Sequence, residues 1–139
     1  MFYVFDIDGT LANAEHRLYH IQTEPKDWVA FYSACYQDAP IDVIIEIMRV
    51  LVKQGHRVEL WTGRSDDTEQ QTRAWCHRFD VPNVPMRMRR EGDHRVDTEV
   101  KAEWLVDGHP DMIFEDRKSM VQMWRGHGIR VAHIAEGDY

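Results

Sequence analysis

Hydrophobic and polar positions along the chain follow two alternating periods. Short runs rich in β-branched and aromatic residues, typical of strands, are separated by stretches in which apolar residues recur every three or four positions, typical of amphipathic helices. The predicted strands are "FYVFDI" (2–7), "RVELWT" (57–62), "VPMRMR" (84–89), "MIFED" (112–116) and "RVAHIA" (130–135). The alternation predicts an α/β fold, a doubly wound and mostly parallel five-stranded sheet with helices on both faces.

Four helices are predicted between these strands. In the clearest one, an apolar stripe from Ile41 to Val52 follows the helical period and Gly55 ends it. The other three cover about 68–79, 97–106 and 118–125. Asp66 or Asp67 is expected to cap the helix over 68–79.

Residues 11–40 have no clean period and predict a helix and a loop over the sheet edge. This stretch of about thirty residues is too short for a large independent lid. We therefore expect a single domain over 1–139 with a minimal cap or none.

Composition describes an ordinary soluble globular protein, with 43% hydrophobic and 29% charged residues among 139. The apolar start "MFYVF" is too short for a signal peptide and no run approaches a membrane span, so we expect a cytoplasmic protein with no membrane partner. Cys35 and Cys76 have no CxxC spacing, which favours reduced structural thiols.

A formal net charge of −7 argues against a broad nucleic-acid footprint, because such binding relies on lysine and arginine to neutralise phosphates. A local basic stretch, "MRMRREGDHR" (86–95), is nevertheless present. It is either a solvated loop after a strand or a contact for a phosphate backbone, and the sequence leaves both open.

Chemistry-bearing residues gather where ligands bind in such a sheet, at the carboxyl ends of the strands. These are Asp6-Ile7-Asp8, Thr62-Gly63-Arg64 and Glu115-Asp116-Arg117, with Lys101 in the helix before the last group. Read singly, each has a structural explanation, such as a helix cap. Together, carboxylates converging on one edge would repel one another unless a cation lay among them, and oxygen ligands suit Mg²⁺. Lysine, hydroxyl and arginine groups grip phosphate, so the set predicts phosphoryl transfer.

The motif "DIDGT" resembles the DxDGT signature of the haloacid dehalogenase superfamily, and Thr62, Lys101 and Glu115-Asp116 follow in that family's order. The resemblance implies that Asp6 is a nucleophile that becomes an aspartyl-phosphate. It implies that Asp8 protonates the leaving oxygen and then activates water, for which we expect the neighbouring acids to raise its pKa.

The same resemblance implies the remaining roles. Thr62 and Lys101 would hold phosphate oxygens, and Asp116 with Glu115 would complete a Mg²⁺ shell beside Asp6 and the Asp8 carbonyl. Glu115 stands where the family usually has aspartate, so it either binds metal through water or supports Asp116.

Most of the chain also resembles the 3′-phosphatase domain of bacteriophage polynucleotide kinase-phosphatases, through "TGR", "RREGDHRVDTEVK" and "EDRKSMVQMWRGHGIRVAHIAEGDY". The match is poorest over 18–40. The substrate-binding residues that it implies are Arg17, Gly63, Arg64, Arg90, Arg95 and Asp97, with Asp97 orienting Lys101. No GxxxxGK[ST] kinase loop occurs, which makes a separate kinase or ligase a plausible partner.

The sequence therefore predicts a Mg²⁺-dependent phosphatase acting on the 3′-phosphate of a polynucleotide. The alternatives are a mononucleotide phosphatase of the same fold, a phospho-receiver domain, which would lack DxDGT, and an inactive binding protein. The sequence does not decide between DNA and RNA, activity on 2′,3′-cyclic ends, or oligomeric state.

Two further patterns carry less weight. His16 and His20 have helical metal-ligand spacing but no accompanying HExxH glutamate. Trp28, Phe31, Tyr32 and Tyr36 have near-helical spacing, which favours core packing, although one of them could stack on a base.

Overall fold

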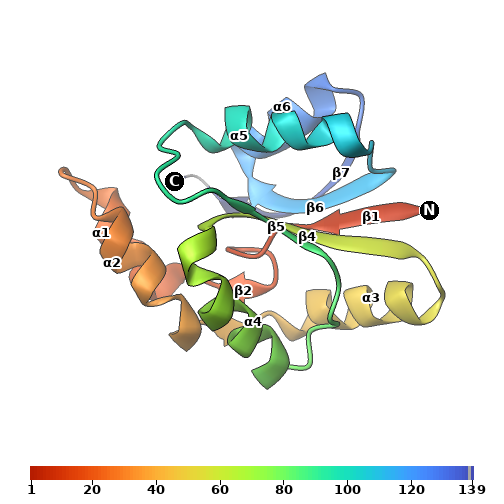
Figure 1. The fold of residues 1–139 in the computed structure, drawn as a ribbon, viewed down its shortest axis with the longest axis horizontal. Helices are drawn as coiled ribbons and strands as arrows, with labels where there is room; N and C mark the ends of the chain where they lie inside the picture. Colours follow the sequence, from red (N-terminus) through yellow and green to blue (C-terminus); the bar gives the residue numbers. More distant parts are fainter. Residues whose placement is uncertain (138) are drawn as a thin grey trace.

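The structure is a computed structural model that describes residues 1–137 and 139; Asp138, within the C-terminal motif, lies outside the described residues. Five parallel strands form the main sheet in the order β5-β4-β1-β6-β7 (Figure 1). Their bounds are β1 Phe2–Phe5, β4 Arg57–Ser65, β5 Met86–Arg89, β6 Met112–Arg117 and β7 Arg130–Gly137. The predicted doubly wound parallel sheet is confirmed.

Helices cover both faces of this sheet, with α3 (Asp42–Lys53) and α4 (Glu69–Arg78) on one face and α5 (Asp97–Glu103) and α6 (Lys118–Gly126) on the other. Short 3-10 turns over Asp66–Thr68 and Trp104–Asp107 extend two of them. The expected cap of the 68–79 helix is wrong. Thr68 is the N-cap residue of α4 and makes no side-chain cap bond, while the Asp66 carboxylate instead accepts the Glu91 N–H at 2.9 Å.

Two hydrophobic clusters explain why the strands read as nearly continuous apolar runs. Leu60 packs toward α3 and α4 with Met48 and Trp75, whereas its neighbour Trp61 packs on the opposite face with Trp124. Because successive strand residues point to opposite faces and both faces are covered by helices, both sets must be apolar.

The stretch over 11–40 is more structured than a helix and a loop. Strands β2 (Ala12–Asn13) and β3 (Ala39–Pro40) pair antiparallel at its base. Between them lie α1 (Tyr19–Gln22), α2 (Trp28–Ser33) and 3-10 turns over Glu15–Arg17 and Cys35–Gln37. Figure 1 shows α1 and α2 as a small hairpin beside the sheet, at the end where the carboxyl ends of the strands lie. This hairpin contributes Trp28 and Tyr32 to the lining of the space at that edge.

Both cysteines are buried and unpaired, as expected of structural thiols. Within the described residues, none of the helices has the length and apolar character that crossing a membrane requires.

Candidate active site

The loop after β1 carries the first two candidate residues at the carboxyl end of the central strand. Backbone N–H groups of Thr10, Leu11 and Ala12 all donate to the Ile7 carbonyl, which folds the chain back directly after Asp6. Gly9 makes this turn at φ +81°, and a Cβ there would collide with the Asp116 carboxylate. Glycine is therefore required both for the backbone conformation and for the close approach of β1 and β6.

On the Asp6 side of this loop, three carboxylates share one ammonium group. Lys101 Nζ, buried at the sheet edge, donates to Asp6 Oδ1 at 2.6 Å and lies 3.8 Å from Glu115 Oε2. Carboxylate oxygens of Asp6, Glu115 and Asp116 lie within 4.8 Å of one another. With three carboxylates and one ammonium, two formal negative charges are left uncompensated. The sequence predicted such a convergence of carboxylates at this edge.

Two buried carboxylate oxygens in this cluster accept no hydrogen bond from the described residues. Glu115 Oε1 accepts the N–H groups of Asp116 and Arg117, but Glu115 Oε2 and Asp116 Oδ1 are buried without a hydrogen bond in the described part of the chain. Buried polar atoms are normally satisfied. Two carboxylate oxygens without a hydrogen bond, in a cluster of three carboxylates with two formal negative charges in excess, fit a divalent, oxygen-preferring cation such as Mg²⁺.

Burial and mutual repulsion also act on the protonation of these acids. Burial, opposed by Lys101 and assisted by the charges of Glu115 and Asp8, raises the pKa of Asp6 to about 7. Burial and the charge of Asp6 raise the pKa of Asp116 to about 6, although the Tyr139 hydroxyl donates to this carboxylate at 3.0 Å. Without a cation, the cluster therefore holds protons near neutral pH.

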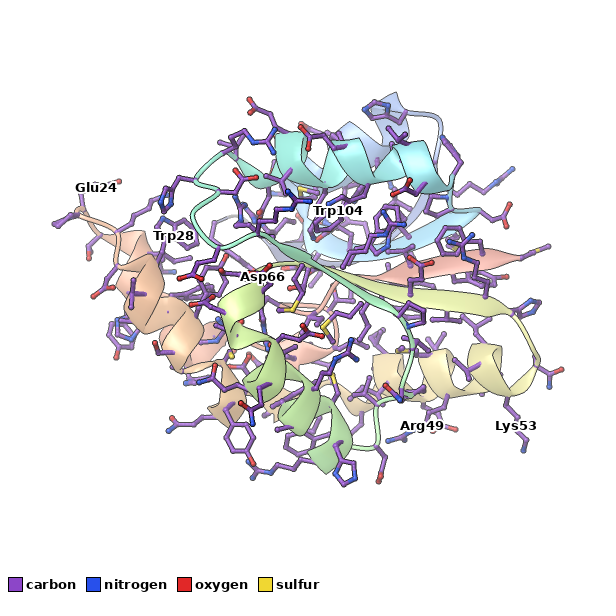
Figure 2. The ribbon with its side chains drawn as sticks, viewed as in Figure 1. Glu24, Trp28, Arg49, Lys53, Asp66 and Trp104 are labelled. Carbon is purple, nitrogen blue, oxygen red and sulfur yellow. The ribbon has the colours of Figure 1, made fainter. Side chains whose placement is uncertain are left out.

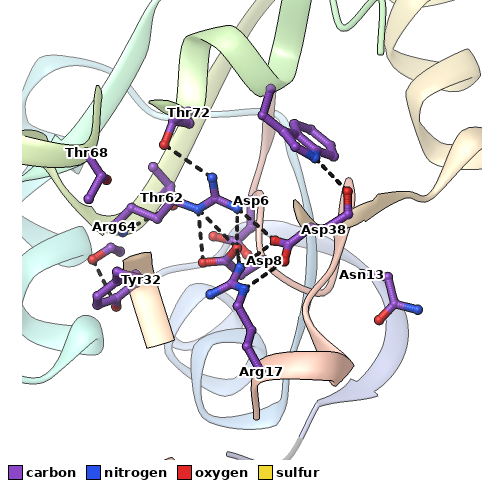
Figure 3. Close-up of polar contacts among 12 residues, drawn as sticks. Asp6, Asp8, Asn13, Arg17, Tyr32, Asp38, Thr62, Arg64, Thr68 and Thr72 are labelled. Atoms are coloured by element: carbon purple, nitrogen blue, oxygen red, sulfur yellow. Dashed lines mark hydrogen bonds and ion pairs between the residues drawn. The ribbon is translucent and has the colours of Figure 1, made fainter. Parts of the chain in front are cut away.

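The Asp8 side of the loop is built differently (Figure 3). Arg17 Nη2 and Arg64 Nη2 donate to Asp8 Oδ1 at 2.5 and 2.6 Å, and the same two nitrogens reach Asp38 Oδ2 at 2.6 and 3.2 Å. Arg17 Nε also donates to Asp38 Oδ1, while Thr72 accepts from Arg64 Nη1. Two guanidinium groups and two carboxylates thus form a charge-balanced, largely buried cluster.

The expectation of a raised pKa for Asp8 is wrong. Burial alone would raise it, but the Arg64 and Arg17 guanidiniums hold the pKa of this carboxyl well below its ordinary range. Sequence reasoning counted the neighbouring acids and did not foresee that both arginines would turn toward Asp8.

Asp38 is a residue that sequence reasoning missed. Its side chain is fully buried, accepts from both arginines and pairs with His16 at 2.7 Å, while its carbonyl accepts from Trp75. Its sequence context gave no signal, since it lies in the unreadable 11–40 stretch and is brought to Arg64 only by the β2–β3 pairing. His16, noted for its spacing from His20, is part of this cluster.

The remaining predicted site residues lie at or near the same edge. Thr62 is fully buried, with Oγ1 accepting the Arg64 N–H at 3.2 Å. The Gly63 carbonyl accepts from Tyr32 and Arg89, and a Cβ on Gly63 would press on Asp97. Arg17 and Arg64 are 0% exposed, so their guanidiniums are engaged with carboxylates rather than open to a ligand.

Asp97 lies one helical turn before Lys101 and acts on it through its charge, so its role in orienting Lys101 stays a prediction. Its carboxylate accepts from Arg89 and, at 2.5 Å, from Arg117 Nη1, while Lys101 reaches past it to Asp6. Arg117 is a second residue whose place was not foreseen.

A cavity of about 20 Å³ is lined by Asp6, Asp8 and Lys101 together with Trp28, Tyr32 and Tyr139. It adjoins a groove of about 780 Å³ whose walls include Arg90 and Arg95. The aromatic pattern of α2 divides accordingly: Phe31 is buried, as core packing predicts, whereas Trp28 and Tyr36 are about 40% exposed.

Known proteins share this fold, and a known family covers the chain. Residues 1–139 match the family described as the polynucleotide kinase PNKP phosphatase domain. A chain of the Pnkp1/Rnl/Hen1 complex is similar, with a TM-score of 0.81 and 22% identity over 99% of this chain and 46% of that chain. The chain thus spans less than half of that relative.

Two hydrolases share the fold at lower identity. The class C acid phosphatase from Bacillus anthracis has a TM-score of 0.71 and 13% identity, over 99% of this chain and 66% of that one. A hydrolase from Streptococcus pneumoniae TIGR4 has a TM-score of 0.63 and 12% identity, over 96% and 92%. The chain belongs to the polynucleotide kinase-phosphatase phosphatase-domain family of the haloacid dehalogenase superfamily, and it is a phosphatase.

Proposed function

We propose that this chain removes the 3′-phosphate from polynucleotide ends in a Mg²⁺-dependent reaction with an aspartyl-phosphate intermediate on Asp6. The observation that carries the proposal is the pairing of two unlike carboxylates in one loop. Asp6 lies among unpaired acids and a lysine, and Asp8 lies two residues on between two arginines. Family membership over residues 1–139 supports the choice of a polynucleotide substrate.

In the first step, an Asp6 carboxylate oxygen attacks phosphorus, and the bond between phosphorus and the 3′-oxygen breaks. Asp8 gives its proton to that oxygen. In the second step, water attacks phosphorus and loses a proton to Asp8, and the bond between phosphorus and Asp6 breaks, which releases inorganic phosphate. Asp6 and Asp8 are both restored.

Asp8 can take both proton roles because its environment changes with substrate. In the free protein its low pKa leaves it ionised, as a base must be. A phosphomonoester dianion at the adjoining cavity raises the pKa of Asp8 by repulsion, so that Asp8 can carry the proton for the leaving group.

The cation fits the cluster of Asp6, Glu115 and Asp116, with the Asp8 carbonyl nearby. Bound Mg²⁺ would offset the excess negative charge, keep Asp6 ionised and polarise the phosphate group. Lys101 neutralises charge beside Asp6, and Thr62 supports the Arg64 backbone from within the sheet edge.

The substrate class and partners extend the same proposal. The similar chain comes from a Pnkp1/Rnl/Hen1 RNA repair complex. By analogy, this phosphatase prepares a 3′ end for a separate ligase or works beside a separate kinase. The second candidate is a mononucleotide phosphatase. The net charge of −7 favours it, because a long polyanion is repelled by the protein surface everywhere except near local cations.

Phosphate release tests the proposal. Wild-type protein is given one strand with a 3′-phosphate, the same strand with a 5′-phosphate, and a 3′-mononucleotide, each with Mg²⁺ or with EDTA. Asp6→Asn serves as the inactive protein and Asp42→Asn, an exposed acid in the first turn of α3, as its matched control. We expect Mg²⁺-dependent release from the 3′-phosphate strand only. Faster release from the mononucleotide would overturn the polynucleotide assignment.

A further inference from the structure

The groove beside the catalytic cavity is much larger than a phosphate group needs. Its volume is about 780 Å³, within the range of sites that enclose whole ligands. Trp28, Tyr32 and Tyr139 line both the groove and the small cavity at Asp6 and Asp8, so the two spaces adjoin each other. The groove is therefore the nearest space for the remaining atoms of a ligand whose phosphate lies at the cavity.

One wall of the groove presents a supported aromatic ring. Trp28 is 40% exposed, yet its ring stacks on Tyr32 with centroids 6.0 Å apart and meets Phe31 edge-on at 5.8 Å. Tyr32 is itself held by its hydroxyl, which donates to the Gly63 carbonyl. Figure 2 shows Trp28 on the α1–α2 hairpin, on the side toward the loop that precedes α5. An indole fixed from behind binds a flat partner with little loss of conformational entropy.

The opposite wall, formed by residues 89–96, offers a free cation. The other arginines of the basic stretch are engaged: Arg87 with Asp107, Arg89 with Asp97, and Arg95 with Asp93 and Glu103. In the part of the chain that the structure describes, only Arg90 among them makes no side-chain hydrogen bond or ion pair, and it is exposed. On the aromatic wall, the Lys26 ammonium lies 5.7 Å from the Trp28 centroid.

This combination favours a single-stranded nucleic acid. Stacking rings and cations that track a backbone are the two elements by which proteins hold single strands, and an unpaired base is needed to lie against a wall. Asp67 and Glu91 also line the groove, and their carboxylates repel a phosphate backbone. Only a short part of the groove is therefore favourable for a polyanion. A ligand without a planar ring would leave Trp28 unused, and one without a second phosphate would leave Arg90 unused.

We infer that the groove holds the unpaired 3′ end of a nucleic acid strand, with the terminal base stacked on Trp28 and the next backbone phosphate at Arg90. The inference rests on the proposed function, because it names the form of substrate that the same site takes. It also assigns recognition to α2, which lies where the resemblance to the family is weakest.

A base-deletion cycle tests the stacking contact. One 3′-phosphate oligonucleotide carries a normal terminal nucleotide and its pair carries an abasic one, and kcat/KM is measured for each with wild type and Trp28→Ala. In wild type we expect loss of the base to lower kcat/KM roughly tenfold, the worth of one stacked base. In Trp28→Ala we expect the two substrates to be equal, since the contact is already lost.

Three variants keep the test independent of folding. Trp28→Phe retains a ring and is expected to restore most of the difference between the two substrates. Tyr36→Ala removes another exposed aromatic, which contacts Arg78 and does not line the groove, and should behave as wild type. Arg90→Gln is expected to lower kcat/KM for a strand severalfold, to flatten its salt dependence, and to leave a 3′-mononucleotide unaffected.

Each outcome has one meaning. If wild type and Trp28→Ala lose the same factor on base deletion, or if a blunt duplex is processed faster than the single strand, the inference is overturned while the proposed function stands. If wild type releases no phosphate from any 3′-phosphate strand yet hydrolyses p-nitrophenyl phosphate, the proposed function itself fails.

Discussion

Asp6 and Asp8 are two residues apart in one loop, yet the chain surrounds them in opposite ways. Around Asp6, three carboxylates share one ammonium, and two of their buried oxygens accept no hydrogen bond within the part of the chain that the structure describes. Around Asp8, two carboxylates meet two guanidiniums, and the charges balance. Burial acts on both acids, but the pKa of Asp6 rises to about 7 while that of Asp8 falls below its ordinary range.

The difference shows which half of the site the protein completes by itself. In the Asp8 half, the arginine side chains balance the charges of both carboxylates and hold the Asp8 carboxylate in one position. The Asp6 half keeps an excess of formal negative charge that protons or a bound cation must neutralise. The proposed nucleophile, in the half that is left open to a cation, and the proposed acid-base group, in the half that is held by arginines, are thus separated by two peptide bonds.

Replacing Asp8 tests the acid-base half and has the largest expected effect. Asp8→Asn should lower turnover of a 3′-phosphate strand by about 10²–10⁴-fold, because the 3′-oxygen is a poor leaving group that needs a proton. With p-nitrophenyl phosphate, whose leaving group needs none, we expect a smaller loss in the first step. Steady-state and burst kinetics with both substrates measure this. An equal loss on both would mean that Asp8 does not protonate the leaving group.

Removing Asp38 tests the charge balance of the same half. Asp38→Ala leaves two buried guanidiniums facing Asp8 alone, and breaking a buried charged network of this kind costs about 3–5 kcal/mol of unfolding free energy. Urea denaturation measures it, and Asp38→Asn should lose less because it keeps one acceptor. Glu46→Gln removes an exposed pair with Arg49 and should change the free energy by less than about 0.5 kcal/mol. A loss for Asp38→Ala as small as that of the control would contradict the account.

Metal and pH should act on the Asp6 half together. The pKa of Asp6 is raised from 3.8 to about 7, so the metal-free folded protein holds more protons than the unfolded chain between these values. Its stability is therefore greatest below about pH 4 with respect to this group, and falls as pH rises toward 7. Asp8 has the opposite sign, since its lowered pKa contributes stability above pH 4 that is lost in acid.

Saturating Mg²⁺ should accordingly raise the melting temperature by roughly 5 °C near pH 8 and much less near pH 5, where protons occupy the cluster. Thermal unfolding with Mg²⁺ and with EDTA at both pH values measures this. Asp116→Asn should abolish the Mg²⁺ increment. An increment of the same size at both pH values would break the link between the unpaired acids and the metal.

The smallest expected effect is that of Tyr139→Phe. The Tyr139 hydroxyl donates to Asp116 at 3.0 Å, and its oxygen lies 3.3 Å from the Asp8 carbonyl oxygen, so it touches both halves. Losing one hydrogen bond to a carboxylate should weaken Mg²⁺ affinity about tenfold, as removal of outer partners of metal ligands does. Titration calorimetry with Mg²⁺ on both proteins measures it, and unchanged affinity would show that Tyr139 only covers the cavity.

The sequence predicted the parts of the molecule that depend on local pattern, namely the strands, the helices and the site residues placed by them. The strands carry continuous apolar runs because helices cover both faces. Asp6 and Asp116 lie at the carboxyl ends of predicted strands, and Lys101 lies within a predicted helix. The sequence could not predict Asp38 or the lowered pKa of Asp8. Both depend on which way Arg17 and Arg64 turn, and that is decided by long-range packing of a segment without a readable period.

The position of Trp28 is another feature that the sequence alone could not predict. Helical spacing predicted core packing, and Phe31 fulfils it, but spacing alone does not say which edge of a short helix faces a groove. That depends on where the β2–β3 pair anchors the hairpin.

Covalent trapping on Asp6 tests the central claim most directly. Asp8→Asn protein is mixed with p-nitrophenyl phosphate and Mg²⁺, quenched in acid and digested, and the peptides are read by mass spectrometry. The account predicts one phosphoryl group on Asp6, present with Mg²⁺ and absent with EDTA, because Asp8 is no longer there to activate water. Release of p-nitrophenol without phosphate on Asp6, or phosphate on another residue, would contradict it.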